Sequence, residues 1–326
     1  MLAIKRRDIC FFALLILTTL SPASAQAENT YPSRPVHLIV GFPPGASADI
    51  TARSLAGGMG QILGQQIVIE NKPGAGSSIA AEYSAHAAND GYTLFLGSSA
   101  NLSNAVINPN PGFDMVKDFA PIALVASVPV VLVVNPSTNV HSVAELIALA
   151  KSKPGTVFYA SVGIGTAPHL AAELLSQRAG VKLVHVPYQG SPQAIADLIA
   201  GRTTMMFSPA STVVGQIAAG KLKALATAAS KRSAVLPDLP TMAEAGMPDF
   251  DTSIWFALMA PKGTSPAVID ELASAAQNAV HAPATAAALG KAGIDTLRGG
   301  PDVVEHLLTT ERRRWSEVAR AAGLIN

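Results

Sequence analysis

The sequence predicts an α/β fold of two lobes, each with a mainly parallel sheet flanked by helices, and a ligand cleft between the lobes. Three observations support this prediction. Short apolar runs typical of strands alternate along the chain with helical patterns, which implies parallel sheets covered by helices. Several of these strands end in loops of small residues that lead into a helix. The chain has 326 residues, a length that corresponds to about two domains.

The composition indicates a folded and nearly neutral protein. Hydrophobic residues make up 49% of the chain and charged residues 14%, a balance that argues against disorder. The formal net charge is +1, so neither a nucleic acid nor an acidic membrane surface is expected as a partner.

Residues 1–25 are predicted to be a signal peptide. Basic residues precede an apolar stretch at 9–20, and Ala23-Ser24-Ala25 has the A-x-A form of a cleavage site. The predicted cut falls before Gln26, with cleavage after Ala27 as the near alternative. The apolar stretch is too short to remain as a membrane-spanning helix.

Export of this kind predicts a soluble periplasmic protein. The single cysteine, Cys10, lies in the segment that is removed, so neither a disulfide nor thiol chemistry is expected in the mature chain. The pair Arg6-Arg7 leaves the export route open between the general secretory and the twin-arginine pathways.

The first strand is predicted at residues 36–40, where the run VHLIV consists mostly of strand-forming residues. The loop that follows is rich in Gly and Pro, and Ser47 or Asp49 can cap the next helix. That helix has apolar residues at helical spacing and ends at Gly64. Residues 97–101, GSSAN, are expected to form a loop. The other elements expected in the first part of the chain are strands at 67–70, 92–96 and 122–125 and a helix at 79–88.

An apolar run at 130–134 is predicted to be a strand buried on both faces. The chain is expected to pass from one lobe to the other near this run. Residues 228–250, rich in Pro, Ser and charge, are expected to form a long surface segment that leads back. The remaining predicted strands are 157–159, 183–186, 205–207, 222–227 and 253–260, and the remaining predicted helices are 141–150, 168–175, 194–200, 213–219, 266–281, 284–289 and 301–322.

The stretch from 158 to 175, FYASVGIGTAPHLAAELL, carries the clearest local signal for ligand binding. A strand ends in a turn with Gly163 and Gly165, which adopt backbone angles that other residues resist. Pro168 suits the first turn of the helix that follows. The free N–H groups and the positive dipole end of such a helix attract an anion without a charged side chain. A single glycine turn of this kind can equally serve only the geometry of the chain.

Repetition of the pattern favours binding. Small-residue loops between a strand and a helix begin at five places, namely Gly41, Gly97, Gly163, Pro187 and Ser208. Two of them precede the predicted crossing and three follow it. Because ligands of open α/β sheets bind at the carboxyl ends of strands, loops from both lobes are expected to converge on the cleft. The predicted ligand contacts from this pattern include Ser99, Asn101 and Ser208.

The sequence has no clear catalytic or metal-binding pattern, and no cofactor is expected. The seven histidines lack metal-ligand spacing. Residues 215–222 nearly match a P-loop but place Leu222 where Ser or Thr is required. His169 either makes structural hydrogen bonds, which is the better interpretation, or donates to a ligand. Asp49 would repel an anion, so it is assigned a role in shaping its loop.

Six stretches, spread over nearly all of the mature chain, follow a familiar order. They are YPSRPVHLIVGFPPGASADITARSLA, ENKPGAGSSIAAE, VKDFAPIALVA, YASVGIGTAPHLAAELL, VHVPYQGSPQAIADLIAG and LPTMAEAG. The sequence resembles the Bug family, the extracytoplasmic solute receptors of tripartite tricarboxylate transporters. The resemblance implies a type II periplasmic-binding-protein fold, with two α/β lobes, two crossing segments and a small organic acid held in the closed cleft.

The resemblance also implies ligand contacts on both lobes and two departures from the family pattern. Gly45-Ala46 stands where the family usually has paired glycines, and the extra methyl narrows that end of the cleft. Ala100-Asn101 stands where many relatives have a Thr-His pair, which changes the contacts at the far end of the ligand. The implied contacts are Phe42, Gly45, Ala46 and Ser47 in the first lobe and Gly163, Gly165, Thr166, Tyr188 and Gln189 in the second.

The predicted function is capture of a small organic carboxylate in the interlobe cleft and its delivery to a membrane permease of the tripartite tricarboxylate type. The first lobe is predicted to comprise residues 28–126 and 251–326, and the second lobe residues 127–250. The protein is expected to be a monomer and not an enzyme. Two alternatives are kept: a periplasmic enzyme that acts on an organic acid through Ser47 and His169, and a sensor component that presents its ligand to a signalling receptor.

Overall fold

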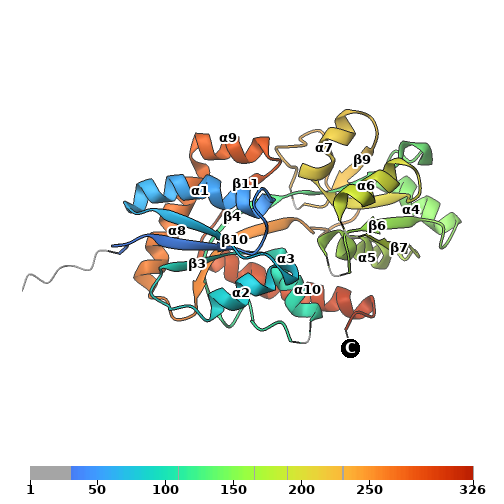
Figure 1. The fold of residues 1–326 in the computed structure, drawn as a ribbon. Helices are drawn as coiled ribbons and strands as arrows, with labels where there is room; N and C mark the ends of the chain where they lie inside the picture. Colours follow the sequence, from blue (N-terminus) through green and yellow to red (C-terminus); the bar gives the residue numbers. More distant parts are fainter. Residues whose placement is uncertain (1–30, 109, 165, 189, 230, 326) are drawn as a thin grey trace, which may run out of the picture.

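The computed structural model describes residues 31–325 apart from positions 109, 165, 189 and 230. The predicted signal peptide and its cleavage site lie outside the described residues. The fold consists of two mixed β-sheets that lie side by side, with helices covering them (Figure 1). The predicted α/β fold with two helix-flanked sheets is therefore confirmed.

The first sheet contains the strands at both ends of the chain, and the second sheet contains those in the middle. The elements before the first passage between the sheets are β1 (Val36–Val40), α1 (Ser47–Leu63), β2 (Ile67–Asn71), the short 3₁₀ helix η1 (Ala75–Ser77), α2 (Ser78–Ala85), β3 (Thr93–Ser98), α3 (Ser99–Ile107) and β4 (Phe119–Val128). Those of the second sheet are β5 (Val130–Val134), η2 (Pro136–Thr138), α4 (Val143–Ser152), β6 (Phe158–Ser161), α5 (Ala167–Ala179), β7 (Val184–Pro187), α6 (Ser191–Ile199), β8 (Met205–Pro209), α7 (Ala210–Ala218) and β9 (Lys223–Thr227). The chain then returns to the first sheet with β10 (Ile254–Pro261), α8 (Pro266–His281), α9 (Pro283–Lys291), β11 (Asp295–Gly299) and α10 (Pro301–Ala321).

Both sheets follow one plan. The strand order is β2-β1-β3-β10-β4-β11 in the first and β7-β6-β8-β5-β9 in the second. The first three strands of each sheet pair in parallel, whereas β10 and β5 run antiparallel to both of their neighbours. The expected mainly parallel sheets are thus mixed. The reason is where the chain enters each sheet. β5 and β10 follow directly after a passage and begin at the edge where the parallel strands end, so they run in the opposite direction. Val130 thus pairs with Pro209, and Phe256 pairs with Ser98.

The two passages between the sheets lie against each other. Pro129 alone separates β4 from β5, and residues 228–253 lead from β9 back to β10. The N–H of Ala228 donates to the carbonyl of Val130 at 2.7 Å, and the N–H of Thr252 donates to the carbonyl of Ala228 at 2.8 Å. These backbone hydrogen bonds hold the two connecting segments together between the sheets.

The hydrophobic core continues from one sheet to the other. Every residue of β5, VVLVV, is buried, as predicted for a strand covered on both faces. The last helix, α10, packs against β4 and α3 of the first sheet and also contacts α5 of the second (Figure 1). None of the described helices is both long and apolar enough to cross a membrane.

Besides the short 3₁₀ helices η1 and η2, the sequence did not predict the helix α3 or the strand β11. Residues 97–101 are not a loop, because β3 continues to Ser98 and α3 begins at Ser99. The side-chain oxygen of Asn101 accepts a hydrogen bond from the N–H of Ser98 at 3.0 Å, a local contact that helps the helix to start. β11 is a short edge strand whose pairing with β4 is interrupted between Thr296 and Gly299, and it has no clear alternation of apolar and polar residues.

Candidate functional site

The loops that the sequence singled out lie at the carboxyl ends of strands in both sheets. In the first sheet, Val40 pairs with Leu96, so the residues after β1 lie beside those at the end of β3. In the second sheet, Tyr159 pairs with both His185 and Met205, so the ends of β6, β7 and β8 are also neighbours. Each sheet therefore gathers its predicted contacts along one edge.

Asp49, in the first turn of α1, fixes the shape of the first loop, residues 41–46. The N–H of Gly45 donates to one carboxylate oxygen of Asp49 at 2.9 Å, and Arg53 donates to both oxygens at 3.0 Å. The amide of Asn71 donates to Asp49 and to the carbonyl of Phe42, each at 2.9 Å. The carboxylate is thus occupied on all sides, which agrees with the loop-shaping role expected for it.

Asp49 should make stability depend on pH. Burial raises the pKa of this carboxyl, but the hydrogen bonds from Arg53, Gly45 and Asn71 outweigh burial and lower it. The stabilisation is therefore present above the unfolded pKa of about 3.9 and is lost as the pH falls through the lower folded-state value. Asp49→Asn should lose about 1.5–3 kcal/mol at pH 7, the range for hydrogen bonds to a charged group.

Urea unfolding between pH 7 and pH 3 checks this prediction, because the difference between wild type and Asp49→Asn should shrink toward acid. A difference that stays constant down to pH 3 would contradict it. Asp90→Asn is the matched control, since the ion pair of Asp90 with Arg34 is exposed on both sides. That change should cost less than about 1 kcal/mol.

Buried hydroxyl groups lie where β1, η1 and α3 meet. The side chains of Ser77 and Ser99 are buried, and within the described part of the chain their hydroxyls have no hydrogen-bond partner. Ser77 lies directly against Gly41, where an added Cβ would come within 1.7 Å of its Oγ. Buried polar atoms are normally paired, so these two hydroxyls are candidates to bind a ligand or an ordered water. Sequence reasoning included Ser99 but missed Ser77, although Ser77 lies in the GAGSS stretch that carries the family resemblance.

Asn101 lies at the same place but is committed to the protein. Its side-chain oxygen accepts from the N–H and the hydroxyl of Ser98 at 3.0 and 2.9 Å, and its amide donates to the carbonyl of Ser77 at 3.2 Å. The residue is fully buried. Its geometry therefore fits a residue that holds the loops together better than one that contacts a ligand directly.

In the second sheet, the Gly163 turn joins β6 to α5. Gly163 has φ of +124°, a value that side-chain-bearing residues rarely adopt. Its carbonyl accepts from the N–H of Thr166 at 3.4 Å and from the Thr166 hydroxyl at 2.7 Å. Ile164, between them in sequence, is 64% exposed. The predicted contacts Gly165 and Gln189 lie outside the described residues.

Tyr188 and Ser208 use their hydroxyls within the protein. The Tyr188 hydroxyl donates to Asp197 on α6 at 2.9 Å, and the same carboxylate accepts from Arg202 at 2.9 Å. A loop was expected to begin at Ser208, but Ser208 is the fourth residue of β8. Its hydroxyl lies 2.9 Å from that of Thr212. The ring of Tyr188 packs beside the core of the second sheet. Direct contacts from these two residues would therefore come from the ring of Tyr188 and from backbone atoms.

Two of the helices that begin at the predicted loops keep their N-terminal N–H groups free of side-chain caps, whereas Ser98 and Asn101 form a capping box at the start of α3. In the described structure no side chain caps α1, which begins after Ala46, or α5, which begins after Thr166. Ser47, an expected cap, lies inside α1 instead. By contrast, Ser142 and Ser265 cap α4 and α8. Because α9 and α10 also begin without such a cap, an open N-terminus alone does not define a site.

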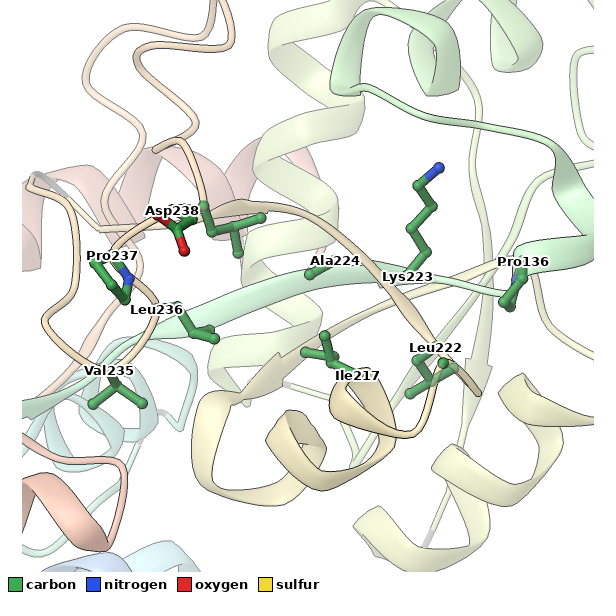
Figure 2. A pocket seen from close by; sticks show the side chains of 11 residues that line it. Pro136, Ile217, Leu222, Lys223, Ala224, Val235, Leu236, Pro237 and Asp238 are labelled. Carbon is green, nitrogen blue, oxygen red and sulfur yellow. The ribbon is translucent and has the colours of Figure 1, made fainter.

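Two cavities lie away from these loops. Figure 2 shows one of about 640 Å³ on the second sheet, between α7, β9 and residues 235–239; Ile217 and Leu222 contribute to its mainly apolar wall. Another, of about 440 Å³, lies between residues 229–234 and the strands β4, β10 and β11. Neither cavity is lined by a predicted ligand contact. The predicted loops are instead open to solvent, as the exposure of Pro43, Pro44 and Ile164 indicates.

Ser47 and His169, the residues of the alternative enzyme hypothesis, lie in the first turns of two different helices. Ser47 is in the first turn of α1, and its carbonyl accepts from the Thr51 hydroxyl at 2.8 Å. His169 is in the first turn of α5, where burial and the neighbouring His185 lower its pKa to about 4. Among the described residues no group of three or more His, Cys, Asp or Glu side chains could hold a metal ion.

The sequence matches a family of transport receptors over most of its length. The model of the tripartite tricarboxylate transporter family receptor (TctC) matches residues 51–324. The chain belongs to this family. BugT of Bordetella pertussis is 38% identical to this TctC-family chain over 311 residues, which are 95% of each protein. The family resemblance seen in the sequence is therefore confirmed.

Solved structures of similar proteins share the fold. The periplasmic binding protein BugD is 34% identical, with a TM-score of 0.72 over 90% of this chain and 99% of BugD. An R. palustris protein solved with adipate is 34% identical, with a TM-score of 0.76 over 90% of this chain and 98% of that one. MatC from Rhodopseudomonas palustris, with bound malate, is 32% identical, with a TM-score of 0.72 over 88% and 99% of the two chains.

Proposed function

We propose that this TctC-family protein is a periplasmic receptor that binds a small organic carboxylate between its two sheets and delivers it to a membrane permease. The observation that carries the proposal is a repeated one. Uncapped helix N-termini follow small-residue loops at the carboxyl strand ends of both sheets, and the buried hydroxyls of Ser77 and Ser99 lie beside the loops of the first. The R. palustris structures with adipate and with malate support a carboxylate as the ligand.

The chemistry of the loops suits an anion held by neutral groups. Residues 42–49, 97–101, 163–169 and 188–193 contain no Lys or Arg, and the nearby Arg53 is committed to Asp49. A helix N-terminus contributes about 0.3–1 kcal/mol to anion binding, or up to ~2 when partly buried. A hydrogen bond to a charged group contributes roughly 1.5–3 kcal/mol. Two helix ends and three such hydrogen bonds reach the roughly 8 kcal/mol that micromolar binding requires.

Closure of two lobes is the proposed mechanism of capture. The lobes we propose are residues 28–126 with 251–326, and residues 127–250, with the hydrogen-bonded passages at Pro129 and Ala228 as the hinge. Because α10 also contacts α5, closure has to move α5 relative to α10. Solution scattering should show a smaller radius of gyration when the ligand is saturating.

Calorimetric titration with adipate and with malate tests the binding step. At least one acid should bind with a micromolar dissociation constant and with little dependence on salt, because no exposed side-chain charge is engaged. The neutral diamide of the same acid is the matched control and should bind at least tenfold more weakly. Equal binding of the acid and its diamide, or no binding of either acid, would contradict the proposal.

Replacing Gly163 by Val should weaken binding of that acid by about 5- to 150-fold. The reason is that a non-glycine residue in such a backbone conformation costs about 1–3 kcal/mol, and the turn would have to move to relieve the strain. Gly155→Val is the control, because Gly155 also has a positive φ but lies before the N-terminal end of β6, whereas the Gly163 turn follows its C-terminal end. It should lower the melting temperature without a change in affinity. Equal affinities of Gly163→Val and wild type would exclude the turn from the site.

Further measurements separate the alternative functions. Nuclear magnetic resonance of the acid after long incubation with the protein should show no conversion, and a product would favour an enzyme that uses Ser47 and His169. Deletion of the cognate permease should abolish uptake that depends on the receptor, whereas a sensor would lose a signalling response instead.

Gel filtration should give a monomer, and the intact mass of the exported protein should correspond to cleavage near Gln26.

A further inference from the structure

A cluster of polar side chains lies beside the start of the Gly163 turn, and the proposed binding step does not use it. β6 and β7 pair in parallel with Tyr159 opposite His185, so that their rings stack at 4.8 Å and 15°. Ser161 is two residues beyond Tyr159 and therefore faces the same side of the sheet. We call Tyr159, Ser161, His169, Glu173 and His185 the Tyr159 cluster.

Hydrogen bonds connect this cluster to the turn. The Nε2 atom of His185 lies 2.7 Å from the Oγ of Ser161, and the N–H of Gly163 donates to the same Oγ at 3.1 Å. The Ser161 hydroxyl is also 3.3 Å from the carbonyl of Gly163, which already accepts from Thr166. Since Ser161 is fully buried, its hydroxyl depends on these partners. The tautomer of His185 decides whether that hydroxyl donates to Nε2 or accepts from it.

We propose that His185 is a positioning residue, which through Ser161 holds the Gly163 turn in its ligand-binding conformation and makes carboxylate affinity depend on pH. The proposal deepens the proposed function and rests on it for the binding readout. The hydrogen bonds from His185 to Ser161 and on to Gly163 are observed independently of any ligand.

The direction of the pH effect follows from the groups around His185. Tyr159 on β6 stacks on it, His169 on α5 lies 4.5 Å from it between ring centroids, and Glu173 on α5 accepts from the Tyr159 hydroxyl at 2.5 Å. Burial lowers the pKa of His185, and Glu173 raises it by less. His185 is thus neutral at pH 7 and gains its proton only below its ordinary value of about 6.5. The positive charge then favours a bound anion, so acidification should tighten binding.

Three variants separate hydrogen bonding from packing and from charge. His185→Gln can place a polar atom near the position of Nε2 but does not titrate. His185→Phe keeps an aromatic ring for the stack on Tyr159 but loses the hydrogen bond, and Ser161→Ala removes the middle of the chain. His86→Gln is the control, because His86 is exposed, follows α2 of the first sheet, and has its Nδ1 atom 2.8 Å from the carbonyl oxygen of Glu82.

The first measurement needs no ligand. Hydrogen exchange of the peptide that contains Gly163 should be faster than in wild type in His185→Phe and in Ser161→Ala. The increase should be smaller in His185→Gln, and His86→Gln should exchange at the wild-type rate. Unchanged exchange in both His185→Phe and Ser161→Ala would overturn the positioning role. This readout stands even if no carboxylate binds, so failure of the proposed function and failure of this inference are distinguishable.

The second measurement is the affinity for adipate or malate, whichever binds wild type more tightly, at pH 7.5 and pH 5.5. At pH 7.5 binding should weaken at least tenfold in His185→Phe and Ser161→Ala and less than fivefold in His185→Gln. The ratio of the dissociation constants of His185→Gln and wild type should be larger at pH 5.5 than at pH 7.5. Because both proteins are measured with the same acid at the same pH, the effect of the ligand's own protonation on affinity cancels in this ratio. A ratio that is equal at both pH values would overturn the pH dependence.

Discussion

Glu311→Ala is expected to lower the free energy of unfolding by about 3–5 kcal/mol, the cost of removing one partner from a buried ionic group. The side chain of Glu311, on α10, is buried and accepts hydrogen bonds from three donors. Trp255 Nε1 on β10 donates at 2.8 Å, Arg314 at 2.6 Å and Trp315 Nε1 at 3.3 Å. Alanine would leave all three donors without this acceptor, and two of them belong to the buried side chains of Trp255 and Trp315.

Urea unfolding of wild type, Glu311→Ala and Glu311→Gln measures this effect. Glutamine keeps an oxygen acceptor of similar shape but loses the charge that Arg314 faces, so its loss should be smaller. Glu305→Ala is the control on the same helix, because the side chain of Glu305 is exposed, and its effect should stay within about 0.5 kcal/mol. A loss of less than about 1 kcal/mol for Glu311→Ala would show that the carboxylate does not fix α10 to β10.

The sequence predicted most of the elements because their local signals and their burial agree. The run VVLVV at 130–134 is apolar throughout, and β5 is buried throughout. Gly64, placed at the end of the first helix by the sequence, has the left-handed φ of +68° that ends α1. Helix 266–281 has the predicted bounds, with Ser265 as its cap and Pro266 in its first turn. In these segments the pattern that favours the element is also the pattern that the packing needs.

The parts that the sequence did not predict depend on contacts between distant residues. The antiparallel direction of β5 and β10 follows from how the chain passes between the sheets, which no local pattern encodes. GSSAN looked like a loop because its residues are small and polar, yet Asn101 and Ser98 use that polarity to begin α3. The commitments of Tyr188 to Asp197 and of Ser208 to Thr212 are likewise visible only in the structure.

Ser77 is the residue whose position was hardest to predict. It has a left-handed φ of +76°, uncommon for a residue with a side chain, and this conformation places its Oγ against Gly41. The sequence analysis left Ser77 in the connection between the predicted strand at 67–70 and the predicted helix at 79–88. The structure shows a buried hydroxyl between the end of β1 and the start of α3, with no hydrogen-bond partner among the described residues, where a surface turn would be exposed.

Gly41→Ala is expected to cost about 3 kcal/mol, the upper part of the usual range for overpacking. An added Cβ at Gly41 would lie 1.7 Å from the Oγ of Ser77 and 2.9 Å from its Cα, so the loop and the serine cannot both keep their positions. Ser77→Gly removes the closer atoms and relieves the positive φ. Alone it should change stability by less than about 1 kcal/mol, since the left-handed conformation costs glycine little.

A double-mutant cycle decides whether this contact is the cause. The double variant Gly41→Ala, Ser77→Gly should be more stable than the sum of the single changes by at least about 1 kcal/mol, within the range for residues in contact. The rescue should be incomplete, because the Cα of residue 77 remains 2.9 Å from the new methyl. Additive single changes in urea unfolding would mean that the first loop moves away from Ser77 without strain. In that case the loop after β1 and the buried hydroxyl would not form one fixed surface, and the first-sheet half of the proposed site would have to be assembled by the ligand.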